Sequence, residues 1–200
     1  MINYFINSKY RYLALAFFVL LMFAPTIVLA ADPSPPAPGS TLEQRVAQRK
    51  QEQQVVLDET QTKRVQKQCK AAQVRLGTVI KDITKLSDNR YNTYRNVDGA
   101  TLISIGKLKI ATKDTFALQQ GRDDFAKQVT QFEATIAQYK QAIEDASLMN
   151  CEADPVGFMA MIVTARSYNN MLSTQSKSIN AVVTDKIKPQ LETFSKELQQ

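Results

Sequence analysis

The two cysteines, Cys69 and Cys151, carry the most distinctive chemistry in this chain of 200 residues. Two thiols in an oxidising compartment form a disulfide, whereas in a reducing one they stay separate small apolar groups. There is no third cysteine to compete for the pairing. We therefore predict an intramolecular Cys69–Cys151 disulfide, with two buried free thiols or an intermolecular bond as the alternatives.

Other reactive groups are scarce. The chain has no histidine, so the commonest general base and metal ligand is missing. Asp123-Asp124 and Glu144-Asp145 are adjacent carboxylates that diverge around a helix, and we expect them on a solvated face. Two cysteines alone do not complete a transition-metal site. We predict no catalytic residue, no metal ligand and no cofactor.

Two short motifs have the residue types of motifs in penicillin-binding enzymes but not their arrangement. Residues 104–107 read S-x-x-K and residues 87–89 read S-D-N. Their order is reversed, the K-T-G element is missing, and both lie in one expected helix that keeps them apart. We interpret both as chance matches in a protein that is not an enzyme.

Residues 1–31 have the pattern of a signal peptide. Basic residues precede an apolar run over 13–29, and two alanines follow it. The run of about seventeen residues is also at the lower limit of a membrane span. We expect an exported protein, secreted or associated with the cell envelope. The alternative is a single-pass anchor that contacts the membrane only through residues 13–30 and leaves the bundle outside.

Two polar segments follow. Residues 32–40 contain four prolines, which indicates a semi-rigid polyproline linker. Residues 41–61 favour a helix, with Ser40 or Thr41 as its N-cap and Gln44 positioned for a capping box. Their apolar side chains are few, so we expect a polar helical extension that is solvated or loosely docked.

Residues 62–200 show stronger helical periodicity. Apolar residues recur at three- and four-residue steps over 62–110. A seven-residue repeat follows over 118–146, interrupted only by Arg122 near its start. Asp154 and the next residue, a proline, are typical of a helix start and open the third helix.

Helix lengths predict the architecture. A short connection at 111–115 makes the first two helices antiparallel. The helical rise from Cys69 to Lys113 nearly equals that from Lys113 back to Cys151, which returns both cysteines to one end. The third helix is long enough to run beside them, with a kink expected at Pro189. The sequence thus predicts an all-α fold, an elongated antiparallel three-helix bundle with a helical N-terminal extension.

The charge is uneven along the chain, which carries a net charge of +6. Residues 62–110 hold eleven basic and three acidic side chains, whereas residues 111–200 hold nine and eleven. Either these segments complement each other by packing, or the first helix binds an anionic polymer or lipid headgroup. Tyr91 and Tyr94 lie among arginines and asparagines, a pattern typical of glycan or nucleic-acid binding but also of core tyrosines.

Several short motifs carry a resemblance. They are Leu42-Glu43-Gln44-Arg45, Cys69-Lys70-Ala71-Ala72-Gln73, Tyr139-Lys140-Gln141-Ala142, Cys151 with Asp154-Pro155-Val156-Gly157-Phe158, and Ile187-Lys188-Pro189. In these the chain resembles a group of uncharacterised exported helical proteins of small-genome candidate-phylum bacteria, over nearly all of the mature chain. The resemblance implies export and a paired cysteine, and it implies no activity.

These observations favour a non-enzymatic exported spacer or adaptor that presents a surface to a protein or cell-wall partner. The alternative is a holdase-like or anionic-polymer-binding envelope protein that uses the basic first helix and residues 42–61. Salt-dependent retention on a cell-wall polymer distinguishes the two, since binding through lysines and arginines weakens as salt screens them.

Overall fold

The computed structural model describes residues 33–197, which form helices and short connections with no strand among them. The helices are α2 (Leu42–Gln53), α3 (Glu59–Ile110), α4 (Phe116–Leu148), α5 (Pro155–Ala181), the π-helical η2 (Val182–Ile187) and α6 (Lys188–Glu197). The predicted all-α helical bundle is confirmed. The predicted export segment, residues 1–31, lies outside the described residues.

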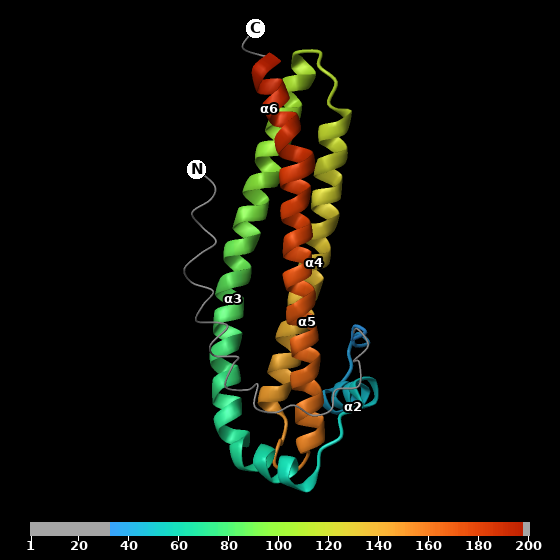
Figure 1. Cartoon of the computed structure of the whole chain (residues 1–200), viewed down its shortest axis with the longest axis vertical. Helices are drawn as coiled ribbons and strands as arrows, with labels where there is room; N and C mark the ends of the chain where they lie inside the picture. The colour runs from blue at the N-terminus through green and yellow to red at the C-terminus, as the bar shows by residue number, and fades with distance from the viewer. Residues whose placement is uncertain (1–32, 198–200) are drawn as a thin grey trace.

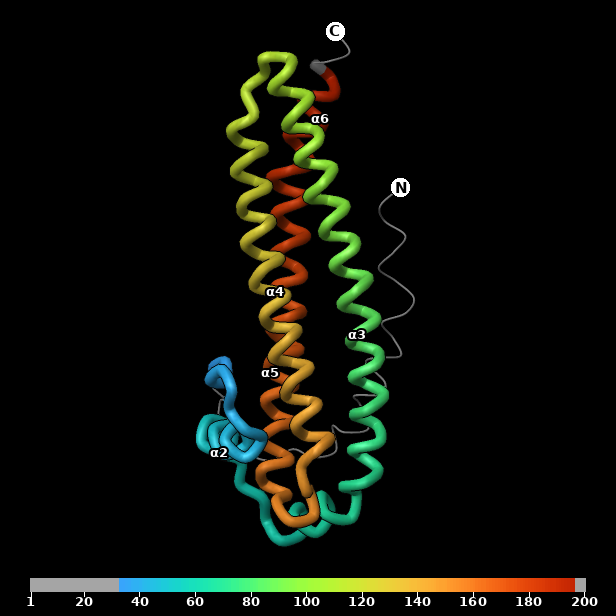
Figure 2. Tube along the Cα trace, turned by 180° about the vertical axis from the view of Figure 1, so that it is seen from behind, coloured from blue at the N-terminus to red at the C-terminus, as the bar shows by residue number. Residues whose placement is uncertain are grey.

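The bundle is elongated. Figure 1 shows the chain running along α3, returning along α4, and running back along α5, η2 and α6. Figure 2, from behind, shows the short α2 beside α5, close to where α3 begins. We call this the cysteine end; it comprises residues 33–58 and 149–154 with the first turns of α3. The opposite end, around residues 111–115, is the turn end.

The long helix α3 starts three residues earlier than its apolar pattern predicts. Asp58 accepts a hydrogen bond from the Gln61 backbone N–H (2.7 Å), and the Gln61 side chain accepts one from the Asp58 N–H (3.0 Å). This capping box satisfies amides that the first turn leaves unpaired. The helix then continues for 52 residues. The asparagine-rich stretch before Gly99 does not interrupt it.

The segment 41–61 differs from the continuous helical extension, solvated or loosely docked, that we expected. Thr41 and Gln44 do form the capping box, but α2 ends at Gln53, and Gln54 adopts a left-handed conformation with φ 45°. Val46 is buried, and its Cγ1 lies within 2.8 Å of where a Cβ on Gly157 of α5 would be. The segment is therefore a short helix packed closely on α5.

The start of α5 explains why α2 docks there. Residues 157–165 are buried at every position, so this stretch is covered on all sides and not along one stripe. A helix that is apolar all round needs neighbours on each face. Helix α4 covers part of this surface and α2 covers another part. A thin apolar stripe on α2 is enough, because α5 supplies most of the apolar surface.

The core divides into two clusters along the bundle. The cluster at the cysteine end includes Cys69, Cys151 and the buried methionines Met149, Met159 and Met161. The cluster towards the turn end is centred on aromatic rings. Its members are Tyr94, Ile105, Leu108, Leu118, Phe125, Phe132, Ile136, Ile179 and Ile187.

Arg122 does not end the apolar seam of α4, although the sequence suggested this. Leu118, one turn before it, is fully buried. The Arg122 side chain turns outward, and its Nε lies 2.8 Å from Oδ1 of Asp98 on α3. An arginine is accommodated at a seam position because its long stem packs on the core while its guanidinium reaches the surface.

The irregularity expected at Pro189 occurs before the proline. The helix runs through Pro189, but the six residues Val182–Ile187 are π-helical, and the Lys188 N–H bonds to the Val183 carbonyl, five residues back. A proline ring crowds the carbonyl four residues before it, and a π-turn widens the helix at that point. Gly121 of α4 faces this segment, where a Cβ would lie 3.4 Å from Ile187 and Lys186.

Candidate functional site

The structure brings the two predicted site residues together at the cysteine end. Cys69 and Cys151 lie at disulfide distance, with Cα atoms 5.7 Å apart across a sequence separation of 82 residues. Both are buried. Two α3 side chains hold the same connection, because the Gln66 and Gln73 amides donate to the carbonyls of Glu152 (2.9 Å) and Met149 (2.7 Å). This end thus joins the start of α3 to the α4–α5 connection.

A network of charged side chains attaches α2 to the bundle; we call Arg45, Arg49, Glu52, Asp145 and Tyr168 the polar clamp. Arg45 Nε and Nη2 donate to the two carboxylate oxygens of Asp145 at 2.7 and 2.6 Å. Asp145 is 1% exposed. This hydrogen bond raises the pKa of Arg45. Asp145 is therefore a buried partner of α2, contrary to the solvated face that its sequence context indicated.

Arg49 forms the second half of the polar clamp. Its guanidinium lies over the Tyr168 ring, 5.8 Å from the centroid, and Nη2 donates to the Tyr168 hydroxyl at 3.1 Å. It also pairs with Glu52 of its own helix. Burial acts to raise the pKa of Glu52, but hydrogen bonds from Ser34, Gln48 and Arg49 outweigh it and lower the pKa below its ordinary value.

The polar clamp also holds the proline-rich linker. Arg49 Nη1 donates to the Ser34 carbonyl at 2.7 Å, and the Ser34 hydroxyl donates to Glu52. Pro33 is buried. The linker is thus attached to α2 and α5 at Pro33 and Ser34, and to α2 again at the Ser40 carbonyl, where the sequence indicated only a spacer. Charged side chains that hydrogen-bond to one another and to backbone carbonyls hold chain segments in place. We assign this structural role to the polar clamp.

Sequence reasoning missed the polar clamp, although one signal for it exists. Arg45 and Arg49 are one turn apart, on either side of Val46, which places both guanidinium groups beside the apolar stripe of α2. The acceptor, Asp145, directly precedes Ala146 of the predicted seam. An acidic residue next to a core position is a candidate for a buried pair. The sequence does not show that these two segments meet.

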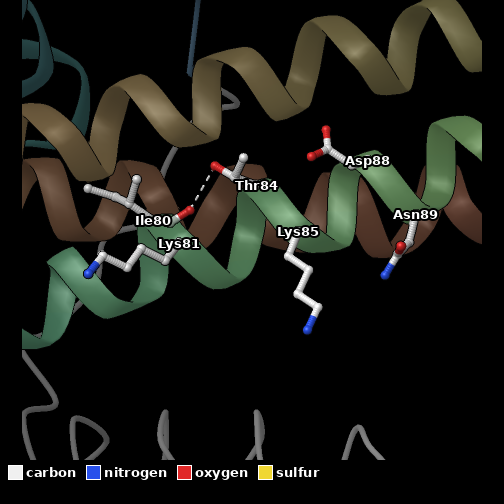
Figure 3. Close-up of a pocket in the computed structure, with 6 residues that line it drawn as sticks. All are labelled: Ile80, Lys81, Thr84, Lys85, Asp88 and Asn89. Carbon is white, nitrogen blue, oxygen red and sulfur yellow. Dashed lines mark hydrogen bonds between the residues drawn. The ribbon is translucent and has the colours of Figure 1, made fainter.

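The described surface is hollowed only shallowly. One hollow, of about 480 Å³, is lined by residues of α3 alone, and Figure 3 shows these side chains. Lys81 and Lys85 extend outward without converging on a common point, and the Thr84 hydroxyl donates back to the Ile80 carbonyl at 3.0 Å. A second hollow of about 350 Å³ lies between α3 and α4. Its lining residues are Ser87, Asp88, Tyr91, Ile136, Ala137, Lys140, Gln141 and Glu144.

The serines of the two motifs that we interpreted as chance matches donate hydrogen bonds to carbonyls of their own helix. Ser104 donates to the Ala100 carbonyl at 2.9 Å, and Ser87 donates to the Thr84 carbonyl at the same distance. Lys186 Nζ pairs with Asp124 at 2.6 Å. Within residues 33–197, no group of three His, Cys, Asp or Glu side chains is arranged to hold a metal ion.

The tyrosine cluster is divided between core and surface. Tyr94 packs edge-on against Phe125 and Phe132, with ring centroids 5.9 and 5.7 Å apart. Tyr91 lines the hollow between α3 and α4, and its pKa is raised by burial. Arg90 donates to the Ser176 hydroxyl of α5 at 2.6 Å. Tyr94 thus belongs to the core and is not available for stacking on a ligand.

Several large apolar side chains are exposed near the turn end. Among the described residues the exposed large apolar side chains are Val56, Val74, Leu102, Ile103, Ile110, Phe116 and Leu148. Four of these seven fall between positions 102 and 116. No helix in residues 33–197 is long and apolar enough to cross a membrane.

Comparison with family models, with curated proteins and with solved structures finds no match to this chain.

Proposed function

We propose that the protein is a non-enzymatic exported spacer or adaptor. In this proposal an elongated antiparallel three-helix bundle, with α2 docked on it, holds a partner-binding surface away from the attached or processed N-terminus. A helix of 33 residues such as α4 spans about 50 Å. The bundle thus has the length to separate two envelope components.

The attachment of the linker to the bundle carries this proposal. A spacer transmits a fixed distance only when its joints are stiff, and a free proline-rich linker would let the bundle swing. Here Arg49 bonds the linker backbone at Ser34, and Arg45 ties α2 to Asp145 of α4. The first described residues therefore move with the bundle as one body.

A distance measurement tests the stiff joint. Spin labels are introduced by a chemistry that spares the cysteines, one at Ala37 in the linker and one at Ala134 on the exposed face of α4. Double electron–electron resonance on the exported protein should give one narrow distribution of distances between the two labels. The variant Arg49→Leu should broaden it, whereas Lys127→Leu, on the exposed surface of α4, should not. A broad distribution in the unsubstituted protein would contradict the spacer proposal.

The charge of α3 favours a second candidate, an anionic-polymer-binding envelope protein. Eleven basic side chains against three acidic ones over 62–110 attract polyanions, and Lys63 and Lys70 are largely exposed.

If this candidate is right, retention of the protein on purified cell-wall polymer should fall steeply with added salt. Lys63, Lys67 and Lys70 are replaced by glutamine in one variant. The control changes three lysines elsewhere, Lys127, Lys177 and Lys196. Equal retention of both variants, or retention that salt does not change, would contradict this candidate.

A further inference from the structure

The exposed apolar side chains of the turn end serve no purpose within the bundle. Leu108 and Leu118 already close the core there, at 3% and 0% exposure. Ile110 and Phe116, on either side of the same connection, are 86% and 71% exposed. Exposed apolar groups that gather in one place indicate a contact surface, whereas single scattered ones do not.

The apolar surface continues along the outer side of α3. Ile103 lies seven residues before Ile110, so the two share one side of the helix, and Leu102 is adjacent. Gly99 and Gly106 follow the same line, and a Cβ on either would meet no other atom within 4 Å. We call Leu102, Ile103, Ile110 and Phe116 the tip patch.

The stretch of chain that carries the tip patch is predominantly positive. Lys107, Lys109 and Lys113 lie within the same stretch of chain, and Asp114 is its single acidic residue. Apolar side chains, including an aromatic ring, interleaved with lysines are typical of segments that lie in the headgroup region of anionic membranes. The apolar groups enter the interface, while the ammonium groups reach the lipid phosphates.

We propose that the tip patch docks on an anionic lipid surface. This inference rests on the proposed spacer function, because it names what the far end of the spacer contacts. It narrows the lipid-headgroup alternative that the basic first helix suggested to one end of the bundle, apart from the contact expected for residues 13–30. With the N-terminal linker held at the cysteine end, the two contacts lie at opposite ends of the bundle (Figure 1).

Charge favours a lipid surface over a second copy of the chain. A symmetric dimer through the tip patch brings the same surface of both copies together, so the lysines of one face those of the other. Asp114 is the single acidic residue of this stretch, too little acidic charge to compensate Lys107 and Lys109 in each copy. An anionic bilayer supplies opposite charge at every position.

A tryptophan probe tests docking at the tip itself. The chain has no tryptophan, so Phe116→Trp places a single indole in the tip patch. Val74→Trp, at an exposed position near the cysteine end, is the matched control. The probe reports the tip alone, and so does not depend on whether residues 1–31 are retained. The full exported protein is mixed with vesicles of phosphatidylcholine alone or with one third phosphatidylglycerol.

The Phe116→Trp emission should shift to the blue with anionic vesicles, and brominated lipid should quench it. It should stay unchanged with phosphatidylcholine, and the Val74→Trp emission should not shift with either. Adding Lys107→Gln and Lys109→Gln should weaken vesicle affinity about tenfold or more, since each lysine near an anionic surface adds to binding. Ile110→Ser should weaken it as well, with circular dichroism confirming an unchanged helix content.

Three results would overturn the inference. One is a Phe116→Trp spectrum that anionic vesicles leave unchanged. Another is an equal shift of Val74→Trp, which would place the contact elsewhere. The third is a doubled mass in vesicle-free buffer that Ile110→Ser abolishes, which would assign the tip patch to a second copy. The two proposals can fail separately. If the spin-label distances are narrow but the Phe116→Trp emission does not respond to vesicles, lipid docking is refuted and the spacer function remains supported.

Discussion

The two ends of the bundle are stabilised by different means. At the cysteine end, α2, the linker and the α4–α5 connection are joined by the cysteine pair and by buried ionic contacts. At the turn end, α3 and α4 pass into each other through a short connection, and the core consists of aromatic and aliphatic side chains. Four large apolar side chains are exposed at or near the turn end, and three, Val56, Val74 and Leu148, are exposed towards the cysteine end.

The difference in how the two ends are stabilised can be measured by comparing one ion pair from each. Arg45 and Asp145 have side-chain exposures of 18% and 1%, whereas Arg122 and Asp98 have 30% and 36%. A carboxylate that is out of water depends on its partner, but one with a side-chain exposure of 36% is partly solvated without it. Removing the arginine of the ion pair should thus lower the free energy of unfolding strongly at the cysteine end and only slightly at the turn end.

The largest expected effect is loss of the cysteine bond. Cys69→Ser with Cys151→Ser should lower the free energy of unfolding by about 4 kcal/mol, because a loop of about eighty residues is no longer closed in the unfolded chain. Denaturant unfolding of the exported protein, with and without reductant, measures it. Non-reducing mass spectrometry should find no free thiol in native material. Two free thiols, or a disulfide-linked dimer, would contradict the predicted bond.

The paired substitution Arg45→Leu and Arg122→Leu compares the ends directly. Arg45→Leu leaves the Asp145 carboxylate buried without its partner and should cost about 3 kcal/mol. Arg122→Leu removes a partly exposed pair and should cost less than about 1 kcal/mol. Both are measured by chemical denaturation of the disulfide-intact protein. Equal losses would mean that Asp145 is not buried by α2.

Gly121 tests how closely α4 and η2 approach near the turn end. Gly121→Val should destabilise the protein by about 2 kcal/mol, because the added methyl groups would overlap Ile187 and Lys186. The control is Gly99→Val, where the space around the residue is open. It should cost little, since valine and glycine are both poor helix formers. Thermal unfolding of the two variants decides whether the close contact is real.

The smallest expected effect is a pH dependence at the cysteine end. The pKa of Glu52 is lower in the folded protein than its ordinary value. The resulting stabilisation is present above the unfolded pKa of about 4.5 and is lost as pH falls through the folded pKa. Stability measured from pH 6 down to pH 3 should fall less steeply in Glu52→Gln than in the unsubstituted protein. Parallel curves would show that Glu52 contributes nothing to this dependence.

The helices themselves follow from local sequence. The Thr41 capping box and the Asp154-Pro155 start are both present where the sequence indicates them. The heptad seam of α4 likewise predicts its buried face, from Leu118 to Ala146. Caps and periodicity act within a few residues, so one chain segment carries all the information they need. The Cys69–Cys151 contact also follows, because the chain from Cys69 to the turn at 111–115 is about as long as its return to Cys151.

The polar clamp could be recognised only after folding. Arg45 and Asp145 are 100 residues apart, and the pattern around each is that of a solvated helix surface. Whether such groups are exposed depends on which helix covers them, and α2 covers Asp145 only because residues 157–165 of α5 are apolar on every side. Short-range propensities determined this protein's helices, caps and cysteine contact. Tertiary packing decided what is buried, because burial depends on chain segments that are distant in sequence.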